Sequence, residues 1–499
     1  MRNILQNVLR LLLQPLFPMS RRNTTLRDGE IVSKLFLSHV FAGIVVLFGV
    51  LSGQKAVVNE VFFGKWTVII LCICVGILAA LSLLISSCRQ RQDVHITAED
   101  EDPSINLQLV FLWGFGLAIL IYLSTNVAIY IQCAIDRPDD LPHSIFLLLV
   151  TVLYILFTVC QVVLLTYNKR SILKPTIQFH FSIVCILAVN FALWYSSTMH
   201  TLFATGNKTT GIQNRSCYHS SEIQKRLGRK LSLILLPPQM EFYILASTLL
   251  ISLWLNSKQY GTSETTHGES VINEHYLREP RAQSSTGVNG KHVLAVILGV
   301  VINIPIVISV VLLDFAYEWQ NTNVITSFDV SETLSSILSF IILCVSYHKI
   351  GSNSVITIRT MLLRDYILIL SSTGEIAFLM VGLLESITGS TVSAATLVNR
   401  ICGMLEIFLQ THLLISTNRQ IGQEFRSGSS FISSCAMILV VSNLTYWLLD
   451  SYNKYYITSY RYIHYKDLNV VNLLIPLVTF YRFFSAMAAY SMYKRYKPN

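Results

Sequence analysis

Charged residues are scarce in this sequence of 499 residues, in which Asp, Glu, Lys and Arg together make up 13%. A soluble globular protein carries about twice that fraction, so the composition argues against a chain that folds in water. Hydrophobic residues make up 53%, and apolar runs of about 18 residues or more recur from end to end, each long enough to cross a bilayer. Because these runs are continuous rather than alternating, they predict transmembrane helices and not a β-barrel.

Motifs of enzymes and nucleotide-driven pumps are also missing. The chain has no HExxH or GxGD motif and no P-loop, so we do not expect an enzyme. Its ten cysteines form no Cys-x-x-Cys pair and no Cys/His spacing typical of zinc, so we expect neither a metal nor a cofactor. Only Cys133 and Cys217 lie near outer loops, and we do not expect a disulfide between them.

The net charge of +9 raises the question of a nucleic-acid partner. The Lys and Arg residues stand at the ends of apolar runs, where they face lipid headgroups. We therefore expect the lipid bilayer as a partner and no nucleic acid.

The apolar runs predict an all-α polytopic membrane protein with twelve transmembrane helices. The polar segment 257–291 is rich in Ser, Thr, Gly, Glu and His, and it reads as a linker between two six-helix halves. The expected domains are a cytosolic N-terminal segment (1–33), an N-terminal membrane domain (34–256), a cytosolic linker (257–291) and a C-terminal membrane domain (292–499). The twelve expected helices lie near 34–52, 66–87, 107–130, 144–167, 176–198, 233–255, 292–313, 330–348, 365–385, 392–416, 428–450 and 469–490.

The distribution of basic residues predicts the orientation in the membrane. Lys and Arg are more numerous in segments that lie inside if the N-terminus is cytosolic, so both termini are expected in the cytosol. The loop 199–232 is then outside, and it carries glycosylation sequons at Asn207 and Asn214.

Polar side chains inside the spans are costly unless they face a partner or water, so they are candidate functional residues. On the tenth span Asn399, Glu406 and Gln410 are spaced by seven and four, which places them on one helix face. Tyr154, Thr158 and Gln161 form a similar stripe on the fourth span. Such a stripe suits a proton path, although interhelical hydrogen bonding is the alternative for most of these residues. The other polar residues in the spans are His39, His180, Asn190, Glu241, Asn303, Glu375, Arg400, His412, Asn443, Tyr481 and Arg482.

The buried carboxylates Glu241, Glu375 and Glu406 are the strongest candidates in this set. A carboxylate deep in a bundle is protonated, paired or hydrated, and each of these states suits proton handling. The alternative is that Arg400 pairs with Glu406 or Glu375.

The two halves share three matches in the same order, which indicates a duplicated six-helix unit. Gln161 and Gln410 each precede a Leu-Leu pair, and Asn-x-x-x-Trp begins at Asn190 and again at Asn443. A proline then precedes Phe-Tyr at the start of the sixth and twelfth spans, with a one-residue ambiguity because the first half has two prolines.

This ordered set of motifs resembles the otopetrin family. The likeness is clearest over 157–256 and 400–490, including Pro476 and the Phe-Tyr-Arg-Phe run that begins at Phe480. The resemblance implies a homodimeric proton channel at the cell surface, with two pseudo-repeated six-helix domains per subunit, opened by external acid. It also implies clusters of Gln161, Asn190 and Glu241 in the first half, and of Gln410, Asn443 and Tyr481 in the second.

Three departures from the family pattern bear on gating. Phe484 stands where the family commonly has His, and Tyr195-Ser-Ser-Thr follows the first Asn-x-x-x-Trp stretch where an acidic residue is common. His412 occupies a position expected to be apolar. The absence of the histidine and of the acidic residue is expected to alter gating or weaken conduction.

A proton-coupled secondary transporter of the major facilitator type is the main alternative, because it also has six plus six helices. The loop after the second span lacks the Gly-rich signature of that class, and no Gly-interrupted pair of helices marks a substrate site. In the channel hypothesis protons enter from outside near Asp136, Asp139, Asp140, His143 or Glu318 and pass by side chains and waters through the spans.

Overall fold

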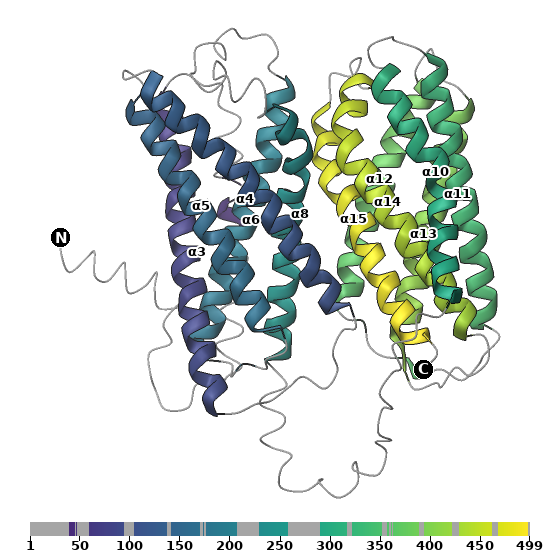
Figure 1. The fold of residues 1–499 in the computed structure, drawn as a ribbon, viewed down its shortest axis with the longest axis horizontal. Helices are drawn as coiled ribbons and strands as arrows, with labels where there is room; N and C mark the ends of the chain where they lie inside the picture. The colour runs from purple at the N-terminus through teal and green to yellow at the C-terminus, as the bar shows by residue number, and fades with distance from the viewer. Residues whose placement is uncertain are drawn as a thin grey trace, which may run out of the picture. The chain divides into compact units, whose positions relative to one another are not determined.

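Long helices make up nearly all of the structure, which is a computed structural model (Figure 1). The expected loop residues Asp139, Asp140, Asn207, Asn214 and Glu318, and the linker beyond Ser257, lie outside the described residues. The structure describes residues 39–44, 46, 59–93, 104–136, 141–169, 173, 176–206, 229–257, 290–316, 322–351, 357–358, 361, 363–388, 394–421, 429–461 and 468–497.

The chain divides into two compact units, of which the first comprises Met1–Glu101 and Leu109–Glu279. Its helices are formed by continuous apolar runs, as expected from the sequence. A short helical stretch at 39–44 falls within the first expected span. The five long helices are α3 (Asn59–Asp93), α4 (Ile105–Asp136), α5 (Leu141–Tyr167), α6 (Ile177–Gly206) and α8 (Arg229–Asn256).

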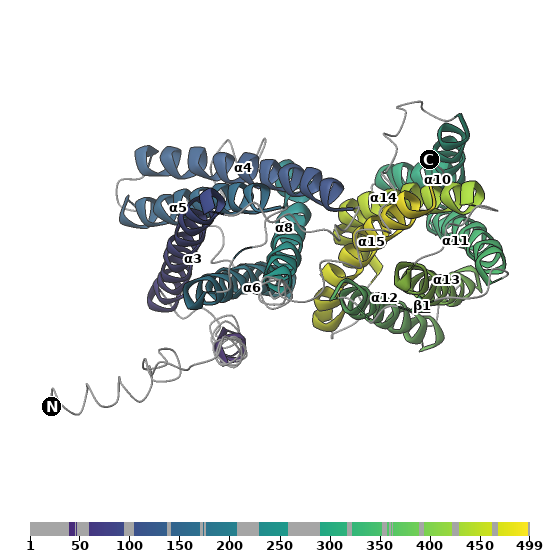
Figure 2. The same cartoon turned by 90° about the horizontal axis from the view of Figure 1, so that it is seen from below.

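The second unit comprises Asp102–Gln108 and Pro280–Asn499. Figure 2 looks along its helices and shows them grouped side by side. They are α10 (Gly290–Ala316), α11 (Thr322–Gly351), α12 (Leu363–Thr388), α13 (Ala394–Arg419), α14 (Ser429–Arg461) and α15 (Leu468–Tyr496).

Each of the eleven expected spans from 66–87 onward coincides with one of these helices. By length and composition, eight of the described helices can cross a membrane. The remaining three are α8, α13 and α15, which carry Glu241, Glu406 and Arg482 respectively. These three helices are less apolar because they hold polar side chains inside the bundle instead of facing lipid. The fold is therefore that of an all-helical, multi-pass membrane protein.

Corresponding helices of the two units pack in corresponding ways. In the first unit α3 packs on α5 and α6, and α8 packs on α6 and α5; in the second, α11 packs on α13 and α14, and α15 packs on α14 and α13. Helix α4 approaches α5 and α8 at Gly116, which lies against Val162 and Phe242. Its counterpart α12 packs on α13 and α15. This arrangement agrees with the duplication inferred from the sequence.

Helix α15 packs on three helices of the second unit, α12, α13 and α14. Its residues from Val478 to Ala489 are all buried, including Ala486, Ala488 and Ala489. In contrast, α10 turns an apolar face outward, with Leu294, Ile297 and Ile308 more than half exposed, as lipid contact requires.

Two short strands and one disulfide were not expected from the sequence. Strand β1 (Thr357–Ile358) pairs antiparallel with β2 (Gln420–Ile421), which joins the segment after α11 to the end of α13. Two-residue strands leave no alternation to detect.

Cys133, at the end of α4, is disulfide-bonded, so the expectation of no disulfide there is wrong. Its partner lies outside the described residues, because the eight described cysteines apart from Cys133 are free.

Gly374 of α12 lies in close contact with α15, and it gives a test of the packing. A Cβ added there lies 2.6 Å from Cβ of Leu477 on α15, whereas one added at Gly114 on α4 meets nothing within 4 Å. Gly374→Ala should therefore destabilise the protein by about 1–3 kcal/mol, the usual cost of overpacking. Gly114→Ala is the matched control. Thermal unfolding of the detergent-solubilised protein measures both, and equal midpoints would contradict this packing.

Candidate functional site

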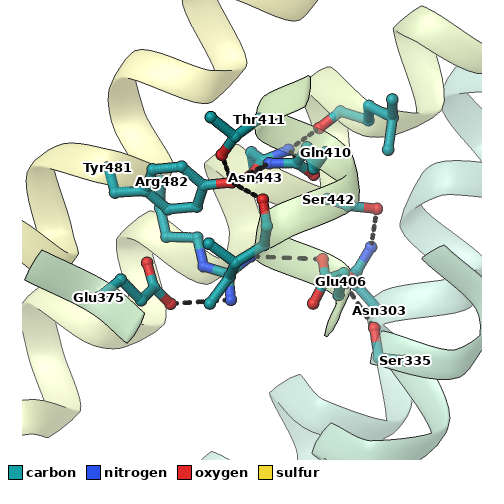
Figure 3. A network of polar contacts seen from close by, with 12 residues as sticks. Asn303, Ser335, Glu375, Glu406, Gln410, Thr411, Ser442, Asn443, Tyr481 and Arg482 are labelled. Atoms are coloured by element: carbon teal, nitrogen blue, oxygen red, sulfur yellow. Dashed lines mark hydrogen bonds and ion pairs between the residues drawn. The ribbon is translucent and has the colours of Figure 1, made fainter. Parts of the chain in front are cut away.

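Three side chains predicted to cluster in the second half do so. Gln410 of α13, Asn443 of α14 and Tyr481 of α15 are almost completely buried. The Gln410 Nε2 amide donates to Asn443 Oδ1 at 3.0 Å and to the Tyr481 hydroxyl at 3.2 Å, and Asn443 Nδ2 donates back to Gln410 Oε1 at 3.1 Å (Figure 3). Because the two amides bond each other, few of their donor and acceptor atoms are left without a partner in a site that has no bulk water.

The Tyr481 hydroxyl connects this amide cluster to its surroundings. It donates to the Ile407 carbonyl at 3.2 Å and lies 3.1 Å from the Thr411 hydroxyl. Asn443 Nδ2 is also bonded to the Leu439 carbonyl at 2.8 Å. The cluster thus links side chains of three helices to the backbones of α13 and α14.

One helical turn from Gln410, three ionisable side chains form a buried ion triad. Arg482 of α15 contacts Glu375 of α12 at 2.9 Å and Glu406 of α13 at 3.4 Å. All three are buried, with 5% or less of each residue exposed. The guanidinium also lies over the Tyr446 ring, 4.6 Å from its centroid. The structure therefore assigns Arg482 as the partner of both carboxylates, where the sequence suggested Arg400.

Helix α11 adds two acidic residues that the sequence analysis did not select. The Thr396 hydroxyl donates to Asp329 Oδ2 at 2.7 Å, and Asn399 Nδ2 donates to Glu332 Oε2 at 2.5 Å. Asp329 is buried and Glu332 is half-buried. Their spacing of three, which continues to Ser335 and Ser336, places these polar residues on one face of the helix. This stripe was missed because Asp329 and Glu332 lie at the edge of the expected span.

These groups follow one another along the interface of α11 and α13. On α13 the order is Thr396, Asn399, Glu406 and Gln410, over a length of about 21 Å at the helical rise of about 1.5 Å per residue. Between Asn399 and Glu406 the neighbouring helix supplies the buried Ser336, which lies near Glu406. We call this set the polar column.

The predicted trio of the first half is buried but is not joined by a described hydrogen bond. Gln161, Asn190 and Glu241 lie on α5, α6 and α8, and each has at most 2% of its surface exposed. The amide atoms of Gln161 and Asn190 have no hydrogen-bond partner among the described residues. A buried amide without a partner costs roughly 1–3 kcal/mol, so these positions favour bridging water.

Other polar residues of the spans form ordinary interhelical hydrogen bonds. Trp254 of α8 donates to His180 Nδ1 of α6 at 2.8 Å, and Asn303 of α10 donates to the Ser442 hydroxyl of α14 at 2.9 Å. Thr158, in the stripe with Gln161, donates to its own helix at the Tyr154 carbonyl, 2.9 Å away. Phe484 is buried against Phe480, with ring centroids 5.4 Å apart, so an apolar contact occupies the position of the family's histidine.

The hydroxyl of Tyr481 gives a test of the amide cluster. Tyr481→Phe removes the group that meets Gln410, Thr411 and the Ile407 carbonyl, and it should lower the stability by about 1–3 kcal/mol because buried polar atoms lose their partner. Tyr366→Phe, at a position that is 57% exposed, is the matched control. The measurement is thermal unfolding in detergent; an unchanged midpoint for Tyr481→Phe would mean that the cluster does not contribute to stability.

A comparison with protein families now identifies this architecture. The family model described as Otopetrin matches residues 195–483, which is more than half of the chain. The match includes the second-half amide cluster, the ion triad and Glu241. It begins at residue 195, so Gln161 and Asn190 lie outside it. No curated protein matches the chain. Because the family match covers more than half of the chain, the chain belongs to the otopetrin family.

Proposed function

We propose that this chain is a proton-selective channel that passes H⁺ into the cell and is activated by extracellular acid. Membership of the otopetrin family, a channel family, supports the general class. The single observation that carries the finer proposal is the polar column along α11 and α13. It places three carboxylates, two amides and several hydroxyls in sequence within an otherwise apolar bundle.

The chemistry of the polar column suits protons. Carboxylates bind and release protons, and amides and hydroxyls orient the waters between them. Glu332 is half-buried and would exchange protons with the outside, whereas Glu406 lies deeper and is almost fully buried. Dehydrating Na⁺ or K⁺ requires a ring of oxygen ligands. The second-half cluster instead pairs its amide and hydroxyl groups with one another, which disfavours metal ions.

The proposed location is the plasma membrane, with both termini in the cytosol and two copies of the chain in a homodimer. This orientation places the C-terminal end of α4 outside. The disulfide at Cys133 supports it, because disulfides form in oxidising compartments. The same orientation places Asp329 and Glu332 toward the outside, where external acid would reach them first.

Whole-cell current in sodium-free solution tests the proposal. Cells that express the chain should show an inward current when the bath is stepped from neutral to acid, the cell should acidify, and the current should reverse near the proton equilibrium potential. No current under acid or alkaline steps, with surface expression confirmed, would favour a secondary transporter or a non-conducting role.

Glu406 and Glu241 test which residues carry the current. Glu406→Gln and Glu241→Gln should each lower the proton current by about tenfold or more, since a positioned proton-transfer group is worth on the order of 10² in rate. Arg482 keeps Glu375 as its partner in Glu406→Gln, so this variant should still fold. Thr373→Val, on the exposed face of α12, is the control and should conduct normally. Unchanged current in both glutamine variants would remove these carboxylates from the path.

A further inference from the structure

The ion triad holds a cation that belongs to the protein itself. The Arg482 guanidinium contacts Glu375 at 2.9 Å and Glu406 at 3.4 Å, and an aromatic ring covers its face. Only 5% of Arg482 is exposed, so bulk water screens these charges little. With both carboxylates ionised, the triad carries one net negative charge.

The guanidinium is a fixed positive charge. Arginine does not lose its proton under conditions in which proteins fold, whereas each carboxylate can gain one. Two carboxylates around one positive charge resemble the oxygen ligands around a bound metal cation, with the guanidinium in the place of the metal. A mobile Na⁺ or K⁺ that reached the triad would be repelled by the guanidinium, and one oxygen of each carboxylate is already engaged with Arg482.

A proton meets no such obstacle at Glu406. Its Oε1 atom accepts the contact from Arg482, while Oε2 has no hydrogen-bond partner among the described residues. A proton can therefore bind at Oε2 without displacing the guanidinium. Protonation adds one charge to a site that is negative by one, so the triad becomes neutral.

We propose that Arg482 is the specificity-determining residue of the second unit, and that its tethered guanidinium excludes hydrated alkali cations while protons pass by way of Glu406. This inference rests on the proposed channel function. A purely structural role is the alternative, because Arg482 joins α15 to α12 and α13. The two roles differ in ion selectivity, since a structural residue changes the amount of current but not which ion carries it.

The test is the reversal potential of Arg482→Gln in whole cells at fixed internal and external pH. Bath Na⁺ is exchanged for the large cation N-methyl-D-glucamine. In the wild type the reversal potential should follow the proton gradient and ignore Na⁺. In Arg482→Gln two buried carboxylates are left without their cation, so adding Na⁺ to the bath should shift the reversal potential to more positive values.

Two matched variants separate the tethered charge from packing. Arg482→Lys keeps a tethered cation and should remain insensitive to Na⁺. Arg364→Gln makes the same chemical change at a partly buried arginine of α12 that bonds Ser491, away from the triad, and should also reverse with the proton gradient.

The outcomes are distinguishable. If the wild type carries no proton current, the channel proposal itself fails. If the wild type conducts and Arg482→Gln also reverses with the proton gradient whatever the Na⁺ concentration, the selectivity role is overturned and the channel proposal stands. If Arg482→Gln does not reach the surface, the double variant Glu375→Gln/Arg482→Gln replaces it. The double variant has the same net charge of minus one as the wild-type triad but no guanidinium, and the Na⁺ sensitivity of its reversal potential then decides the question. Failure of both variants to reach the surface would assign Arg482 to folding and overturn the inference.

Discussion

The ion triad of Glu375, Arg482 and Glu406 is the interaction on which the second unit depends, because it joins three helices at charges that lipid cannot solvate. Each carboxylate alone would be expensive at this depth, and the arginine alone more so. Together they fix how α15 faces α12 and α13. That orientation brings Tyr481, the residue before Arg482, against Gln410 and so sets the amide cluster.

The two units share a plan but differ in charge. Taking the second proline of the pair, Pro238, as the counterpart of Pro476 places Ile244 where the second unit has Arg482. The first unit holds the buried carboxylate Glu241, along with amides at Gln161 and Asn190 that have no described hydrogen-bond partner. The second unit instead has side chains that bond one another directly. Duplication has thus kept the helix packing while the polar chemistry of the halves has diverged.

The sequence predicted the helices well because each is a continuous apolar run, and it predicted the stripe on α13 because periodicity shows which residues share a face. It could not show which face of a neighbouring helix meets that stripe. Arg400 was therefore suggested as the ionic partner instead of Arg482, and the acidic residues Asp329 and Glu332 of α11 were missed. Those contacts depend on the rotation of each helix about its axis, which tertiary packing sets.

The most direct test of the central claim is proton flux in liposomes that contain the purified chain alone. With a potassium ionophore to clamp the potential and a pH-sensitive dye inside, an acid step outside should acidify the lumen, and Na⁺ should not enter. Such flux would show that the chain itself conducts protons. Liposomes with correctly folded protein and no acidification above that of empty liposomes would contradict the account.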